Sequence, residues 1–148
     1  QKMIDFALRK KKPSSTGFCY RSVKEALYNK KGGNGLISAK PPDRAAIQAK
    51  DTLEKKFGFV NLLDVEPYKS ELKSPSDAPK GAILVYSSGR RCGKVPDCGH
   101  VEIKTGEPGE PGYVSDYYSK TAINETPFAL RFGTKYKLIG VMIKGRNI

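Results

Sequence analysis

The sequence predicts an α+β fold, in which a group of helices is followed by an antiparallel sheet. Apolar residues with helical spacing lie before position 58, whereas short apolar or alternating runs, which are typical of strands, begin at position 81. The stretch "GEPGEPG" at 106–112 separates two of these runs and has the composition of a turn. This order, with helices first and hairpin-connected strands afterwards, is typical of α+β proteins.

Three helical segments are predicted, over 2–10, over 17–30, and from "PPD" at 41–43 to Gly58. The second segment is the most informative, because Cys19, Val23 and Leu27 fall on one apolar face. We expect Val23 and Leu27 to be buried. Cys19 lies near the start of this helix, just after the polar stretch "SSTG".

Four strands are predicted, over 81–86, 100–105, 113–118 and 136–143. The clearest alternation is in "HVEIKT", where Val101 and Ile103 point to one face and His100 and Glu102 to the other. His100 therefore lies on the polar face of its strand, and it is the only histidine in the chain.

Length and composition indicate one globular domain over residues 1–148. Hydrophobic residues make up 38% of the chain and charged residues 28%, which is unlike a disordered protein. No apolar run approaches the roughly 20 residues that a membrane-spanning helix needs, so no membrane span is expected. The chain begins at Gln1 and not at Met, which indicates that a signal peptide or another segment preceded it.

The formal net charge of +12 favours an anionic partner, such as a cell wall, a membrane surface or nucleic acid. The one dense basic run, residues 9–12, is interpreted as a solvated helix end. Nucleic acid is not the expected partner, because Trp is absent and the Tyr residues show no repeated basic–aromatic pattern. A non-enzymatic domain that binds polyanions remains the alternative from a different functional class.

The three cysteines suggest one disulfide and one free thiol. Cys92 and Cys98 have a C-x5-C spacing that does not fit the usual zinc knuckle, and one histidine cannot complete a metal site, so no metal or other cofactor is expected. A short-loop disulfide between them fits better and implies an oxidising compartment. Cys19 is then left unpaired.

The unpaired Cys19 and the single His100 together suggest a cysteine-based active site. Amide groups at a helix N-terminus stabilise a thiolate, and the same groups can bind an oxyanion. A hairpin centred on residue 108 places Asp116 opposite His100, where a carboxylate orients the imidazole ring. Glu102, on the face of His100, is the fallback for this role. Each residue alone has an ordinary structural explanation, since most buried cysteines are core residues.

The motifs "APKGAILVYSSG", "GHVEIKT" and "YVSDYYS", together with a helix-borne Cys, resemble the papain-like NlpC-type and CHAP amidase/peptidase superfamily. The resemblance covers residues 14–118 and implies a papain-like fold with Cys19 as nucleophile, His100 as base and Asp116 as the third residue. The "D-C-S-G" context of many NlpC-type members is absent, and the basic loop 90–98 is an addition to the general pattern.

The same resemblance implies that the protein cleaves amide bonds in peptidoglycan stem peptides or their cross-links. Its expected partners are peptidoglycan and an inhibitor or immunity protein, and its expected location is secreted or periplasmic. Arg90, Arg91 and Lys94 precede His100 and are candidates for pairing with substrate carboxylates. A thiol-dependent acyl transferase using the same residues is a further alternative.

Overall fold

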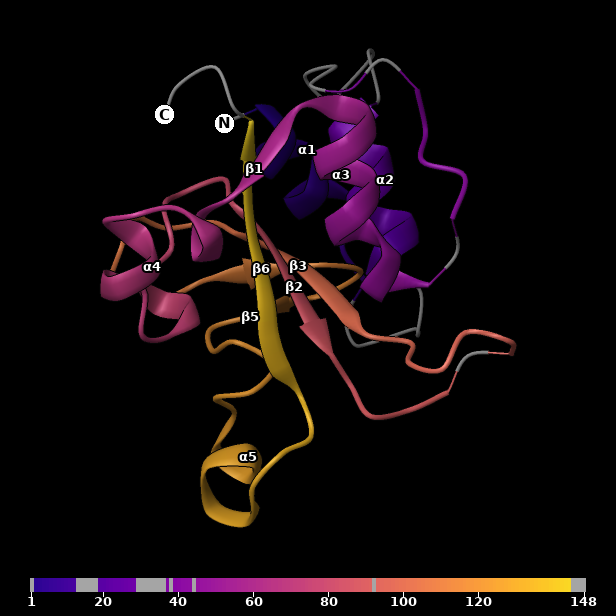
Figure 1. Cartoon of the computed structure of the whole chain (residues 1–148). Coiled ribbons are helices and arrows are strands. Elements are labelled where there is room, and N and C mark those ends of the chain that lie inside the picture. Colours follow the sequence, from indigo (N-terminus) through magenta and orange to yellow (C-terminus); the bar gives the residue numbers. More distant parts are fainter. Residues whose placement is uncertain are drawn as a thin grey trace.

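A computed structural model describes residues 2–12, 19–28, 37, 39–43, 45–91 and 93–144 (Figure 1). The fold is α+β, as predicted. It is built on a six-stranded sheet with the strand order β1-β6-β2-β3-β4-β5. Every strand pair in the sheet is antiparallel. The strands are β1 (Phe59–Asn61), β2 (Ile83–Ser87), β3 (His100–Lys104), β4 (Tyr113–Val114), β5 (Tyr118–Ser119) and β6 (Lys137–Lys144).

The three predicted helices are present, and the first has the predicted bounds. They are α1 (Lys2–Lys10), α2 (Cys19–Tyr28) and α3 (Ala49–Phe57), and the short 3-10 helix η1 (Ala46–Gln48) leads into α3. Gly58 ends α3 in the left-handed conformation with φ 71°, as its position after the last apolar residue predicts. The elements that pattern alone did not indicate are β1, the 3-10 helices η2 (Leu62–Asp64) and η3 (Pro75–Asp77), and the short helices α4 (Tyr68–Glu71) and α5 (Pro127–Phe132).

The larger core lies between helices α1–α3 and one face of the sheet, the face that carries Ile83, Val101 and Ile103. In Figure 1 the three helices gather on one side of the strands. Val23 and Leu27 of α2 are both 0% exposed, as predicted. This packing places the start of α2 against β3.

The other face of the sheet carries a second core, which includes Leu84 and Tyr86 of β2 and is covered by η2, α4 and neighbouring loops. The polar face of β3 is therefore buried as well, with His100 and Glu102 7% and 4% exposed. Lys104 on the same face is 0% exposed, and its ammonium donates to three carbonyl groups of the following turn, those of Gly106, Glu107 and Glu110. Buried polar groups must be hydrogen-bonded in this way.

The predicted strand over 113–118 is interrupted. It forms β4, then a tight turn in which the amide of Ser115 donates to the carbonyl of Tyr117, and then β5, which pairs back on β4. Among the described residues, no helix is both long enough and apolar enough to cross a membrane. The basic run at 9–12 ends α1 and is exposed, as predicted.

Candidate active site

Cys19 is the first residue of α2 and is a free cysteine. It is partly buried and packs against the larger core. The first amide groups of an α-helix have no partner within the helix, so they are available to an anion placed at that end. This position therefore places a half-buried thiol in a local positive potential.

His100 is the first residue of β3, and its side chain forms a hydrogen bond with Cys19. Burial of the ring lowers the pKa of His100, but hydrogen bonds to Cys19 and Glu102 and the charges of these two groups outweigh burial and raise the pKa to about 10. The ring is therefore protonated at neutral pH. An imidazolium beside a sulfur atom favours the thiolate, which is the nucleophilic form of cysteine.

Glu102 holds the other side of the imidazole ring. Its Oε1 lies 3.1 Å from Nε2 of His100, and the two side chains are both buried. Since Nε2 faces Glu102, Nδ1 is the ring nitrogen left for the thiol of Cys19. The second oxygen, Oε2, accepts hydrogen bonds from the hydroxyl of Tyr86 at 2.7 Å and from the amide of Ile123 at 3.3 Å. The carboxylate is thus fixed on both oxygens.

Two tyrosine rings enclose His100. The ring centroids of Tyr86 and Tyr136 each lie 5.9 Å from that of His100, with Tyr136 in an edge-on arrangement. Burial and the neighbouring charge of Glu102 raise the pKa of Tyr86, so its hydroxyl remains a donor to Glu102. Apolar walls around an ion pair exclude water and strengthen its electrostatic interaction.

Asp116 is not opposite His100, because β4 ends at Val114 and the hairpin register also differs by one residue from the prediction. A hairpin centred on residue 108 would pair Ile103 with Tyr113, whereas the structure pairs Ile103 with Val114. The loop 105–112 holds an even number of residues, so the centre falls between two residues and the pairing shifts by one. A shift of one residue turns every side chain of a strand to the other face.

Asp116 lies in the turn after β4, beside the N-terminal segment of the chain. Its backbone carbonyl accepts a hydrogen bond from the amide of Lys12, and its carboxylate accepts one from Ser115 at 3.0 Å. The acidic group on the imidazole is the fallback residue Glu102. The only sequence signal for Glu102 was its position two residues after His100 on the same strand, which places both side chains on one face. This signal required no assumption about the turn.

The basic loop before His100 is exposed at all three candidate substrate-binding residues, Arg90, Arg91 and Lys94. Cys92 lies outside the described residues, so its disulfide with Cys98 stays a prediction. Within the described residues, no group of three or more His, Cys, Asp or Glu side chains is arranged to hold a metal ion.

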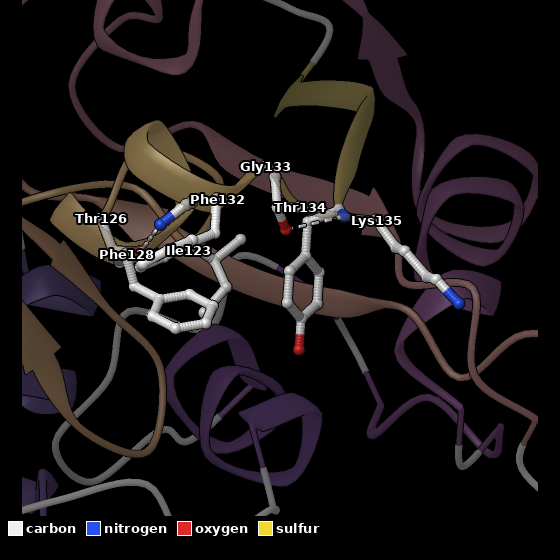
Figure 2. A pocket seen from close by; sticks show the side chains of 9 residues that line it. Ile123, Thr126, Phe128, Phe132, Gly133, Thr134 and Lys135 are labelled. Atoms are coloured by element: carbon white, nitrogen blue, oxygen red, sulfur yellow. Dashed lines mark hydrogen bonds between the residues drawn. The ribbon is translucent and has the colours of Figure 1, made fainter.

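A hollow of about 560 Å³ is lined by Ile123, α5 and residues 133–136 (Figure 2). Ile123 and Tyr136 line it, and these are the residues whose amide and ring contact Glu102 and His100. Figure 2 shows Ile123, Phe128 and Phe132 close together on one side of the hollow and Lys135 on the other. The exposed aromatic residues come from α5, and periodicity missed this helix because its apolar side chains face solvent, Phe128 being 71% exposed.

Lys135 connects this hollow to the basic loop. Carbon atoms of its side chain lie 3.1–3.7 Å from the point where a Cβ atom on Gly89 would be, so Lys135 packs over the residue that precedes Arg90. The catalytic candidates, the hollow and the basic loop therefore adjoin one another.

No protein-family model matches the sequence, and a search of curated proteins finds no match. Among solved structures, the chain resembles the native type VI effector–immunity complex Tae3–Tai3 from Ralstonia pickettii, with a TM-score of 0.56 and 21% identity over 93% of each chain. A selenomethionine form of the same complex matches with a TM-score of 0.50 and 16% identity, over 93% of this chain and 98% of that chain. At this level of identity the similarity establishes a shared fold.

Proposed function

We propose that the protein is a cysteine hydrolase that cleaves amide bonds in peptidoglycan stem peptides or their cross-links. The observation that carries this proposal is the hydrogen bond between Cys19, at a helix start, and a buried His100 whose other nitrogen faces Glu102. A nucleophile, a base and an orienting group in contact are the requirements for covalent acyl transfer. The substrate class rests on the resemblance to the NlpC-type and CHAP superfamily and on the net charge.

In this mechanism the thiolate of Cys19 attacks the carbonyl carbon of the amide. Amide groups in the first turn of α2 bind the developing oxyanion. The protonated His100 gives its proton to the leaving nitrogen as the C–N bond breaks, which leaves a thioester on Cys19. Water then attacks the thioester while His100 takes a proton from it, the C–S bond breaks, and the carboxylic acid leaves. The thiolate of Cys19 and the protonated ring of His100 are thereby restored. Glu102 holds the ring in place through both steps.

The substrate is proposed to lie along the hollow between the catalytic residues and the basic loop. Stem peptides carry free carboxylates, and Arg90 and Arg91 are exposed where such groups would approach. Replacing both by Gln should raise KM with kcat little changed, because these contacts form equally in the ground and transition states. Replacing Lys55 and Lys56 of α3 by Gln is the matched control, since it also removes two adjacent exposed cations but on a different element.

A protein inhibitor is the proposed partner besides peptidoglycan, because the structures that share this fold were solved as effector–immunity complexes. Action outside the cytoplasm, in a secreted or periplasmic setting, follows from the proposed substrate. The polyanion-binding alternative predicts that Cys19 and His100 lie far apart, whereas they are hydrogen-bonded. An acyl transferase would use the same residues and differ only in the acceptor.

The decisive experiment is incubation with purified peptidoglycan followed by mass spectrometry of the released fragments. Hydrolysis adds water across one amide bond, and Cys19→Ala should release nothing above background. An added primary amine distinguishes a transferase, which would yield a new amide in place of the free acid. Fragments that appear equally with Cys19→Ala would refute the proposal.

A further inference from the structure

The segment before His100 is held by one carboxylate that the proposed mechanism does not use. Oδ1 of Asp97 accepts hydrogen bonds from the amide and the hydroxyl of Ser88, both at 2.8 Å, and from the amide of Gly99 at 2.8 Å. Its Oδ2 accepts one from the amide of Gly89 at 2.9 Å. A single side chain thus joins the end of β2 to the residue immediately before His100.

Ser88 completes this arrangement from the other strand. It is 4% exposed, and its hydroxyl oxygen accepts hydrogen bonds from the amides of Gly99 at 3.0 Å and Arg90 at 3.2 Å. The loop 89–98 is therefore closed at its base by side chains, independently of what its exposed tip does. Hydrogen bonds from several backbone amides to a carboxylate are individually among the stronger ones in proteins.

The backbone at Gly99 leaves little freedom in how β3 begins. Gly99 has φ +71°, and a Cβ atom there would lie 2.6 Å from the carbonyl oxygen of Tyr86 and 2.7 Å from the amide nitrogen of Ile47. The amide of Ile47 also donates to the carbonyl of Cys98 at 3.0 Å. The chain is thus packed from two sides directly before the imidazole.

We propose that Asp97 is a positioning residue, which sets the distance between the imidazole of His100 and the thiol of Cys19 by tying Gly99 to Ser88 and Gly89. The inference rests on the proposed function, because it concerns the same catalytic pair. Burial alone would raise the pKa of Asp97, but the hydrogen bonds from Ser88, Gly89 and Gly99 hold it below its usual value, so the group stays an acceptor across the working pH range.

Asp97→Asn is the test variant, since it keeps the size of the side chain but turns one of the two acceptors into a donor that faces an amide. A displacement of the imidazole of about 1 Å can cost about 100-fold, so we expect kcat to fall by roughly 10- to 100-fold. KM should change less than when Arg90 and Arg91 are replaced by Gln, because both arginines remain and Asp97 does not itself line the hollow proposed for the substrate. Asp77→Asn is the matched control: Asp77 also accepts two backbone amides, those of Lys73 and Ser74, but in η3, away from His100.

The single histidine of the chain allows a readout that loss of stability alone would not move. Its NMR titration reports His100 without ambiguity, and iodoacetamide labelling reports the reactivity of Cys19. In folded Asp97→Asn the titration midpoint should move below that of the unchanged protein, and labelling at neutral pH should slow. Asp77→Asn should match the unchanged protein in both.

The outcomes separate the two proposals. If the unchanged protein releases no more fragments from peptidoglycan than Cys19→Ala does, the proposed function fails. If the unchanged protein is active and Asp97→Asn leaves the midpoint of His100, the labelling rate of Cys19 and kcat unchanged, Asp97 has no positioning role. Should Asp97→Asn not fold, Ser88→Ala removes the hydroxyl that links Gly99 and Asp97, and the same shifts, smaller in size, are required of it.

Discussion

Replacing Glu102 by Gln tests which carboxylate serves His100. The change keeps the size of the side chain and removes its charge, 3.1 Å from Nε2. Two unit charges at that distance attract by about 5 kcal/mol at an effective dielectric constant of about 20. Gln still accepts a hydrogen bond, so part of this interaction survives, and we expect about 3–4 kcal/mol to be lost in the transition state. That corresponds to a fall of roughly 10²- to 10³-fold in kcat/KM.

The assay is hydrolysis of a soluble muropeptide over a range of pH, with Asp116→Asn as the control. Asp116 is as buried as Glu102, 2% against 4% exposed, but it lies in the turn after β4. Asp116→Asn should therefore cost less than about tenfold, since it leaves the bond between Glu102 and the imidazole in place. The opposite result, a large loss with Asp116→Asn and nearly full activity with Glu102→Gln, would refute the register and the role of Glu102.

The remaining predictions concern pH, the nucleophile and the core. Hydrolysis needs the protonated ring of His100, so its rate should decline as pH rises through about 10. In Glu102→Gln this decline should begin at lower pH, and a decline at the same pH in both proteins would contradict the role of Glu102. The raised pKa of His100 also stabilises the fold below about 6.5, and this contribution is lost as pH rises through about 10. The difference in free energy of unfolding between the unchanged protein and His100→Ala, from urea titrations, should therefore shrink at high pH to the cost of lost packing; a constant difference would contradict this. Cys19→Ala should abolish turnover and iodoacetamide labelling of that position while circular dichroism stays unchanged, and residual turnover would point to another nucleophile. Leu27→Ala in the core should lower the free energy of unfolding by about 3–5 kcal/mol, whereas Leu130→Ala, at a residue 72% exposed, should change it by less than about 0.5 kcal/mol; equal effects would mean that α2 is not packed as described.

Sequence reasoning was reliable where one local signal decided the outcome. The period of Val23 and Leu27 depends only on helix geometry, and both are buried. The alternation in β3 likewise placed His100 and Glu102 on one face, because this depends on strand geometry and not on the neighbouring strands. Counting histidines and cysteines singled out Cys19 and His100, and this required no knowledge of the fold.

Contacts that depend on a turn or on a second layer were decided only by the tertiary structure. The even-numbered loop 105–112 shifted the hairpin by one residue, and β4 ends at Val114, so Asp116 lies in a turn and not opposite His100. Composition could not reveal this, because Gly and Pro permit several turn lengths. The polar face of β3 was expected outside the core, but Tyr86 and Ile123, distant in sequence, supply the hydrogen bonds that allow Glu102 to be buried. A strand's own residues determine which side chains share a face. Whether that face meets solvent or forms a site depends on what folds over it.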